Sequence, residues 1–409
     1  QREGVIVPDE DAALRAIAFD RSGRHPEALA AFVRWRQRIE VDDAAAAYAE
    51  RRAAALATSL GRAAVIEVAQ TEKEGARQCL DALAGAPPPG DAPAWVQRCR
   101  AAPTKIGILL PRSGPLSALA DTQLAAATIA IDLLAQDNPQ IGDVIWHDSG
   151  SEAGTSADGA AALVARGATV IVGPVGAANV RAAKGRVGMA ARMITPGEPV
   201  AEVTGAAPTL DTRVAALVDV ALQRGAEKLV VLVPDSGYGK RAAQAASKRA
   251  EKTKLKSPHV VTYPADTTSF AEVLGPLGKS LTSKTAVIIG DHVTRTEMLV
   301  RQLARDGKGP SAPKGPLVLA TAEGISESEA SVGHDILAGL FVAPTAAATP
   351  DVARFVEAYA KAEGSAPSDQ ALLVFRALAI AFAGSASTSA PVVIVRVEGG
   401  HLVVQSPSS

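Results

Sequence analysis

The segment that most constrains the fold of this 409-residue chain is KIGILLPRSGP, residues 105–115, with the helix-like stretch that follows it. Residues 105–110 are an apolar run with the length and composition of a β-strand buried on both faces. Pro111 and the Ser-Gly-Pro cluster after it break the run, and residues 116–135, rich in Ala and Leu, predict a helix. Strand, turn and helix form half of a βαβ unit, and open α/β sheets bind ligands at the carboxyl ends of their strands. The turn is therefore predicted to form one lip of a ligand cleft.

From residue 104 onward, short apolar segments alternate with Ala-rich helical segments. Regular alternation predicts mostly parallel sheets with helices on both faces, and the strands are too numerous for one sheet, so two lobes are expected. The expected strands are residues 106–110, 143–147, 169–172, 192–195, 228–233, 259–263, 286–289, 317–320 and 339–343. The expected helices are residues 155–166, 179–188, 212–224, 239–254, 270–281, 294–306 and 350–364. Residues 392–397 and 401–405, separated by Glu-Gly-Gly, predict a terminal β-hairpin.

The first hundred residues have a different composition. Residues 10–99 are dominated by Ala, Leu, Arg and Glu and lack strand-like runs, which predicts an all-α domain over residues 1–103. Its expected helices are residues 11–21, 26–39, 43–60 and 64–84. The spacing of Gly23, Ala28 and Phe32 resembles half a tetratricopeptide repeat, and a generic helical bundle packed through alanine is the alternative.

Two cysteines, Cys79 and Cys99, flank a turn-rich stretch. Two unrelated buried thiols are one interpretation. We favour a disulfide that ties two helices together, which would stabilise the fold by about 3 kcal/mol in the chain-entropy model. Such a bond would imply an oxidising compartment. Metal binding is not expected, because no second Cys pair or His pair accompanies the cysteines.

The bulk composition excludes several classes of function. The formal net charge is −1 and aromatic residues make up 3% of the chain, so neither electrostatics nor stacking favours a nucleic-acid partner. No uninterrupted apolar run reaches the roughly 18 residues of a membrane span, so no transmembrane segment is expected. The opening residues QREGVIVPDE lack the features of a signal peptide, although an exported chain could begin in this way after cleavage.

Sequence signatures of enzymes are not found. Residues 275–280, GPLGKS, look like a phosphate-binding loop, but Val273 occupies the position of the first required Gly. The six histidines are scattered without metal-ligand spacing. We expect a non-catalytic protein without metal or cofactor.

Six segments in order resemble the landmarks of a known family: IGILLPRSGPLSAL, VIVGPVGAANV, RMITPGEPVAEVT, LVVLVPDSGYGKR, TAEGISES and GLFVAP. The chain from about residue 104 to residue 405 resembles the type I periplasmic binding proteins, most of all the leucine/isoleucine/valine-binding, extracellular ligand-binding receptor group. The resemblance implies an α/β fold whose two lobes, joined by three crossovers, close on a small ligand. The implied lobes are residues 104–208 plus 345–390 and residues 209–344 plus 391–409, with crossovers near residues 208–212, 344–349 and 385–391.

The family binds an amino acid through separate contacts to its carboxylate and its ammonium group. On the carboxylate side, Gly176 and Ala177 start a helix that aligns with the family's Ser-rich anion loop, so only backbone N–H donors remain. Gly197 lies in the next loop, where Pro199 replaces a hydroxyl donor.

The opening turn contributes Arg112 and Ser113 to the same predicted lip of the cleft. Arg112 is an unusual cation at a cleft mouth and would favour an acidic ligand. An ordinary surface arginine is the alternative.

On the ammonium side, Glu323 aligns with the family's acidic ligand contact, and an exposed glutamate at a helix start is the alternative. Asp291 and His292 replace a tyrosine-bearing loop at the cleft edge, where a solvated turn is the alternative. Tyr238 lies between glycines after a strand, and its ring would either cap the ligand or pack on its own helix.

The resemblance implies a periplasmic or cell-envelope receptor for a small polar molecule such as an amino acid, with the membrane component of an ABC transporter as its partner. A lipid anchor in a longer precursor remains open. A second hypothesis comes from the helical front domain. Joined to this fold, it resembles the outer-membrane lipoprotein activators of penicillin-binding proteins, whose partner would be a peptidoglycan synthase.

Overall fold

The computed structural model describes residues 10–40, 44–86, 88–99, 104–137, 141–255, 257–347, 349–383 and 391–405. By its contacts the chain divides into two compact units. The first comprises Gln1–Ala118, Ile131–Thr195 and Ala377–Thr388, and the second comprises Leu119–Ala130, Pro196–Arg376 and Ser389–Ser409.

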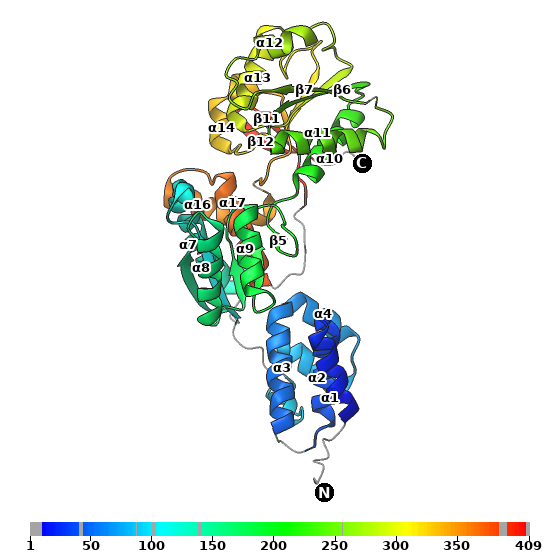
Figure 1. Ribbon diagram of the computed structural model, residues 1–409, viewed down its shortest axis with the longest axis vertical. Coiled ribbons are helices and arrows are strands. Elements are labelled where there is room, and N and C mark those ends of the chain that lie inside the picture. The colour runs from blue at the N-terminus through cyan, green and yellow to red at the C-terminus, as the bar shows by residue number, and fades with distance from the viewer. Residues whose placement is uncertain are drawn as a thin grey trace. The chain divides into compact units, whose positions relative to one another are not determined.

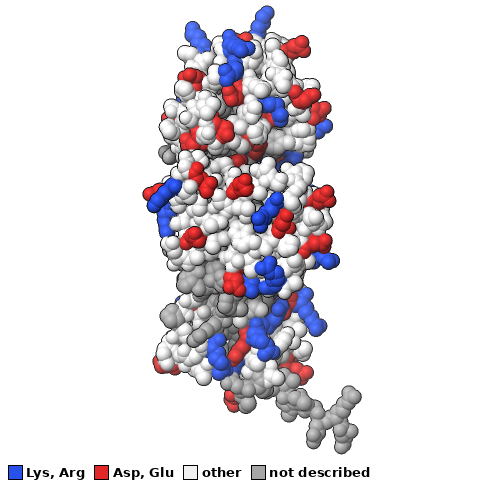
Figure 2. All heavy atoms as spheres, turned by 90° about the vertical axis from the view of Figure 1, so that its left-hand side faces the viewer, with Lys and Arg blue, Asp and Glu red and all other residues white. Residues whose placement is uncertain are grey.

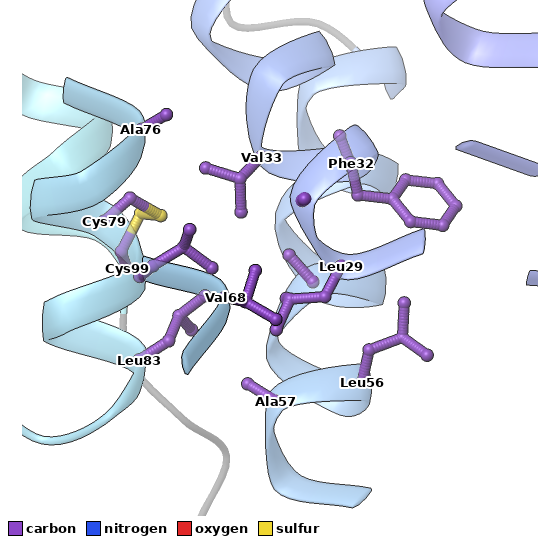
Figure 3. Packing of buried hydrophobic residues seen from close by; sticks show 14 of the residues in the cluster. Leu29, Phe32, Val33, Leu56, Ala57, Val68, Ala76, Cys79, Leu83 and Cys99 are labelled. Carbon is purple, nitrogen blue, oxygen red and sulfur yellow. A yellow bond between two sulfur atoms is a disulfide. The ribbon is translucent and has the colours of Figure 1, made fainter. Parts of the chain in front are cut away.

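The N-terminal region is helical, as its composition predicts (Figure 1). Its helices are α1 (Glu10–Arg21), α2 (His25–Arg38), α3 (Ala44–Leu60), α4 (Arg62–Gln70), α5 (Glu74–Leu83) and α6 (Ala94–Gln97). Their buried faces share one apolar core, in which Leu29, Phe32 and Val33 of α2 pack among side chains of the other helices (Figure 3). The tetratricopeptide-like interpretation stays a prediction.

A disulfide between Cys79 on α5 and Cys99 just after α6 lies at the edge of this core (Figure 3). The predicted bond is therefore confirmed, and it joins two helical segments 20 positions apart in the chain.

The prediction of one helix over residues 64–84 is wrong, because α4 and α5 are separate helices. The Thr71 hydroxyl donates to the carbonyl of Val68 (2.8 Å), and Lys73 adopts an extended backbone before α5 begins. A threonine that bonds the preceding turn competes with continuation of the helix.

The first α/β sheet has four parallel strands within the first unit, in the order β2-β1-β3-β4. They are β1 (Thr104–Leu110), β2 (Ile141–Asp148), β3 (Val170–Val172) and β4 (Arg192–Thr195). The connecting helices are η1 (Pro115–Leu119, a 3-10 turn), α7 (Ala120–Asp137), α8 (Ala153–Ala165) and α9 (Ala177–Val187). Leu110 pairs with Asp148, so β1 and β2 end side by side.

The 22-residue segment Pro115–Gln136 is the one helix within the described ranges that is long and apolar enough to cross a membrane, by length and composition only. It follows β1 directly, and Ala126, Ala127 and Ala130 on it are fully buried. A single helix of this kind is weak evidence for a membrane span, since core helices of globular domains have the same composition.

The second sheet has seven strands in the order β12-β11-β10-β9-β8-β6-β7. They are β6 (Lys228–Pro234), β7 (His259–Tyr263), β8 (Thr285–Ile289), β9 (Leu317–Ala320), β10 (Phe341–Val342), β11 (Val395–Glu398) and β12 (His401–Val404). Strands β6 to β10 are parallel to one another, whereas β11 and β12 form the predicted antiparallel hairpin.

Apolar cores cover both faces of the second sheet. Val230 and Leu232 of β6 face one core, and Leu229, Val231 and Val233 face the other, as the alternation of a β-strand requires. One face is covered by α10 (Leu210–Gln223) and α11 (Gly237–Ala250) (Figure 1). The other is covered by α12 (Ala271–Leu274), η2 (Gly275–Leu277), α13 (Val293–Arg305), α14 (Glu327–Val332) and α15 (His334–Leu337).

The remaining elements are β5 (Thr204–Gly205), η3 (Pro350–Val352), α16 (Ala353–Glu363) and α17 (Asp369–Ala383). Phe355 of α16 stacks on Phe375 of α17, with ring centroids 4.4 Å apart. The helix predicted over residues 270–281 is shorter than expected: α12 passes into the 3-10 turn η2, because Pro276 cannot continue an α-helix.

Candidate ligand-binding site

Three loops meet at the carboxyl edge of the first sheet, beginning with those after β1 and β2. The backbone N–H of Arg112 donates to Asp148 Oδ1 (2.7 Å), and the N–H of Gly150 donates to the same oxygen (2.8 Å). Burial alone would raise the pKa of Asp148, but hydrogen bonds from Arg112, Ser113 and Gly150 outweigh it and hold that pKa below its ordinary value. Asp148 is thus an acceptor that fixes the predicted lip of the cleft.

Ser113 is held in the same turn. Ser151 Oγ donates to the Ser113 carbonyl (2.8 Å) and accepts from the N–H of Leu116 (2.8 Å). The side chains of Arg112 and Ser113 are exposed. The guanidinium of Arg112 has no acidic partner among the described residues.

The third loop ends at Gly176, which precedes α9 with φ +93° in the left-handed region that favours glycine. No side chain caps this helix start, and Gly176 and Ala177 are exposed. Asn179 Nδ2 donates to the carbonyls of Val175 (3.0 Å) and Ser151 (3.4 Å). The structure therefore brings Arg112, Ser113, Gly176 and Ala177 to one sheet edge.

The second unit gathers another set of predicted residues at the carboxyl edge of its own sheet. Tyr238 follows β6, Asp291 and His292 follow β8, and Glu323 follows β9. The N–H of Glu323 donates to the Asp291 carbonyl (3.1 Å), and the N–H of Val293 donates to the Glu323 carbonyl (2.8 Å). These bonds tie the loops after β8 and β9 together.

Glu323 is the centre of this second set. Arg213 Nη2 and Tyr238 Oη both donate to its Oε1. Tyr238 Oη also lies 2.8 Å from Thr321 Oγ1. The Glu323 side chain is 22% exposed, so it is not the exposed glutamate of the alternative interpretation.

Arg213 is fully buried and was not predicted. Its Nη1 donates to the carbonyl of Ala343 (3.0 Å), the residue after β10, and its Nε has no partner among the described atoms. Burial alone would lower the pKa of Arg213, but the charge and hydrogen bond of Glu323, together with Tyr238 and Glu198, outweigh burial and raise that pKa above its usual value. Burial, reinforced by the charge of Glu323, also raises the pKa of Tyr238 well above its ordinary value. The cluster is therefore a guanidinium–carboxylate pair with a protonated phenol.

Asp291 is engaged by other residues of its own unit. It accepts from Tyr263 Oη (2.6 Å), from Arg295 Nε and Nη2 (2.8 and 2.6 Å) and from the N–H of His292 (2.7 Å). Its side chain is 3% exposed, so the solvated-turn interpretation does not describe it. His292 is exposed, and its Nδ1 caps α13 by accepting from the N–H of Thr294.

Gly197 falls in the second unit, whereas Gly176 and Ala177 fall in the first. Its carbonyl accepts from the N–H of Ala207 (2.9 Å). The next residue, Glu198, accepts from the N–H of Leu210 (3.1 Å) and from Arg241 Nη2 (2.9 Å). This loop thereby supports the start of α10, the helix that carries Arg213.

The sequence did contain a signal for Arg213. The apolar stripe of α10 includes Leu210, Val214 and Leu217, all fully buried, and Arg213 falls on that stripe one turn after Leu210 and one turn before Leu217. A charged residue on an apolar stripe indicates a buried charge, which must have a partner.

A separate hollow of about 860 Å³ lies in the helical region, lined by α1, α2 and α4. Phe19, Ala31 and Val68 contribute apolar surface to it, and Arg15 and Glu67 are among its charged residues. None of the predicted site residues lines it. On the face of the molecule drawn in Figure 2, acidic and basic side chains are interspersed, as the net charge of −1 suggests.

Two helix-flanked, largely parallel sheets, each with polar loops at its carboxyl edge, define a two-lobed ligand-binding class of protein. The family model described as "Periplasmic binding protein" matches residues 103–391. The chain therefore belongs to the periplasmic binding protein family, with the two-lobed type I fold, and the predicted resemblance is confirmed. Membership implies a location in the periplasm.

Solved structures agree on this fold. A branched-chain amino acid ABC transporter periplasmic ligand-binding protein from Burkholderia xenovorans is 13% identical, with a TM-score of 0.60 over 74% of this chain and 94% of that one. The substrate-binding protein LivJ from Streptococcus pneumoniae, in complex with isoleucine, is 16% identical, with a TM-score of 0.54 over 74% and 99%. A solute-binding protein from R. palustris, in complex with benzoate, is 14% identical, with a TM-score of 0.53 over 73% and 94%.

None of the curated protein sequences is significantly similar to this chain. The family match begins at residue 103, so α1 to α6 precede it. The second hypothesis, an activator that contacts a peptidoglycan synthase, receives no support from these comparisons.

Proposed function

We propose that this protein is the solute receptor of an ABC transporter and that it binds a small polar molecule with a carboxylate, such as an amino acid or a related acid. The observation that carries the proposal is the gathering of polar loops at the carboxyl edges of both sheets in a member of this family. The isoleucine and benzoate complexes of the solved neighbours support a small carboxylate as ligand.

The proposed binding residues fall into two sets. Arg112, Ser113 and the N–H groups at Gly176 and Ala177 would meet the carboxylate of the ligand, because a helix N-terminus and a cation both favour an anion. Tyr238, His292 and the loop of Glu323 would face the rest of the ligand. Gly197, in the loop after β4, stays a predicted contact of the carboxylate side.

Asp291 was predicted as a ligand contact, and we now assign it a supporting role in the second set. Its carboxylate holds the loop of His292 through Tyr263 and Arg295.

The mechanism we propose is closure about the three crossovers. A ligand that contacts both lobes stabilises the closed state and shifts the population toward it. The lobes would be residues 104–208 plus 345–390 and residues 209–344 plus 391–409. Binding without catalysis is supported by membership of a family of binding proteins.

A thermal-shift screen of the full chain against amino acids and short carboxylic acids tests the proposal. A ligand at 100 times its Kd adds about 2.7 kcal/mol to the free energy of unfolding, so a true ligand raises Tm visibly. Small-angle scattering with that ligand should show a smaller radius of gyration. No Tm shift with any compound at millimolar concentration would contradict the receptor function.

The matched control is a pair of arginine variants. Arg112→Ala should weaken the binding of a carboxylate ligand, whereas Arg301→Ala, which removes an exposed ion pair within α13, should leave it unchanged. Equal ligand affinities of the two variants would show that Arg112 is not part of the site.

A further inference from the structure

The carboxylate that a receptor of this kind would offer to a ligand ammonium is already neutralised inside this protein. Arg213 and Tyr238 donate to the same oxygen of Glu323. A ligand ammonium near Glu323 would therefore lie beside a guanidinium charge in a partly desolvated place, where like charges repel strongly.

Arg213 is not free to move out of the way. Its side chain is fully buried, and Nη1 is fixed on the carbonyl of Ala343. Releasing Glu323 would leave a buried guanidinium without its counter-charge, which is one of the costliest changes in a protein interior. The pair is thus a fixed feature of the second unit.

The neighbouring acids offer no replacement. In the described loops that directly follow β6, β8 and β9, the other two acidic residues are Asp235 and Asp291. Asp291 is buried and paired with Arg295, and Asp235 is paired with Lys240 on the surface (3.1 Å). These three loops therefore present no unpaired carboxylate to a ligand, and Asp266, which is exposed after β7, lies outside them.

The carboxyl edge of the first sheet differs, because an exposed cation lies in one of its loops. Arg112 is exposed without an acidic partner among the described residues, and the start of α9 is uncapped. Asp148, which touches this turn, already accepts the N–H groups of Arg112 and Gly150. Of the groups left available on this edge, Arg112 and the start of α9 suit an anion, whereas the exposed Glu152 after β2 does not.

Resting on the proposed receptor function, we infer that the ligand is a small carboxylic acid without an amino group and that Arg213 sets this preference by occupying Glu323. The carboxylate would be bound by the first set of residues. The remainder of the ligand, uncharged, would lie against Tyr238, whose hydroxyl is already committed to Glu323. Arg213 acts through Glu323 and does not touch the ligand.

The experiment compares pairs of compounds that differ only in the amino group. Titration calorimetry of the full chain would use 4-methylpentanoate against leucine, 3-methylbutanoate against valine, and 3-phenylpropanoate against phenylalanine. At least one acid should bind, and its amino counterpart should bind at least about tenfold more weakly, since each tenfold is 1.4 kcal/mol of binding free energy. An amino acid that binds as tightly as its acid overturns the inference and leaves the receptor function standing. If no member of any pair binds and the wider screen is also silent, the receptor function itself fails.

A variant pair separates the specificity role of Arg213 from a structural role. Arg213→Gln leaves the charge of Glu323 unpaired and should move the acid-to-amino-acid affinity ratio toward the amino acid by about tenfold or more. Arg241→Gln removes an exposed cation on α11 and should leave the ratio unchanged. If Arg213→Gln folds and the ratio does not move, Arg213 does not determine specificity. If it does not fold, the wild-type ratios alone decide the ligand class.

Discussion

Arg213 and Glu323 are 110 positions apart in the chain and form an ion pair in which the arginine is fully buried and the glutamate is 22% exposed. The pair joins the first turn of α10 to the loop after β9, and Arg213 also holds the carbonyl of Ala343 after β10. The Arg213 side chain therefore connects Glu323 in the candidate site with two of the predicted crossover segments, which lie near residues 208–212 and 344–349. A change in the pair should affect both stability and ligand choice.

Arg213→Met should lower the free energy of unfolding by about 3–5 kcal/mol, because it leaves the Glu323 charge partly buried without its partner. Urea unfolding followed by circular dichroism measures this change. Arg241→Met is the control: its ion pairs with Glu198 and Asp211 are half exposed and should contribute about 1 kcal/mol or less. Similar losses in the free energy of unfolding of both variants would show that the buried pair contributes no more to stability than the exposed pairs.

The disulfide gives a second prediction. The Cys79→Ala/Cys99→Ala double variant should unfold its helical region at lower temperature, with a loss of about 3 kcal/mol for a loop of this size. The wild-type chain in reductant should show the same loss, and the double variant should not respond to reductant. A double variant as stable as the oxidised wild type would contradict a stabilising role.

Much of the α/β fold was predictable from the sequence. The strands predicted at residues 192–195, 259–263 and 317–320 coincide with β4, β7 and β9. β4 and β9 are largely buried, and strands buried on both faces are continuous apolar runs bounded by turn residues. β7 is mostly exposed at the end of its sheet, and its Val, Thr and Tyr residues are typical of strands. The terminal hairpin was equally clear, because Glu-Gly-Gly separates its two strand-like runs, and Gly399 and Gly400 both adopt the positive φ that glycine favours.

The polar partners of the site were not predictable in the same way. Local pattern placed Tyr238, Asp291 and Glu323 at strand ends, but it could not show that Arg213 would reach Glu323 or that Tyr263 would reach Asp291. Such pairs depend on which strands become neighbours in the sheet, and β8 and β9 are neighbours only after folding. The break between α4 and α5 was missed for a local reason, because it depends on the hydrogen bond from the Thr71 hydroxyl to the Val68 carbonyl.

Asp148 leads to a prediction about pH. Its pKa is lower in the folded protein than in the unfolded chain, so the stability that its carboxylate contributes is present above the unfolded pKa of about 3.9 and is lost as the pH falls through the folded pKa. The stability difference between wild type and Asp148→Asn should therefore be constant from neutral pH to about pH 5 and shrink below about pH 4. Thermal melts across this range measure it. Asp143→Asn is the control, because that carboxylate is 75% exposed. A wild-type advantage that grows on acidification would contradict the assignment.

Two glycines in the first turn of α11 give a matched pair around Tyr238. A Cβ on Gly239 would lie 2.0 Å from the carbonyl oxygen of Pro234 at the end of β6, so the strand and helix would have to move apart. Gly239→Ala should therefore cost about 1–3 kcal/mol or more, and by displacing Tyr238 it should also weaken ligand binding. A Cβ on Gly237 meets nothing within 4 Å, and its backbone is not in the left-handed region. Gly237→Ala should accordingly be neutral or stabilising by up to about 1 kcal/mol, since alanine is the better helix former. Urea unfolding and calorimetry on the two variants measure both effects. Equal stability of the pair would mean that the close approach of β6 and α11 does not position Tyr238.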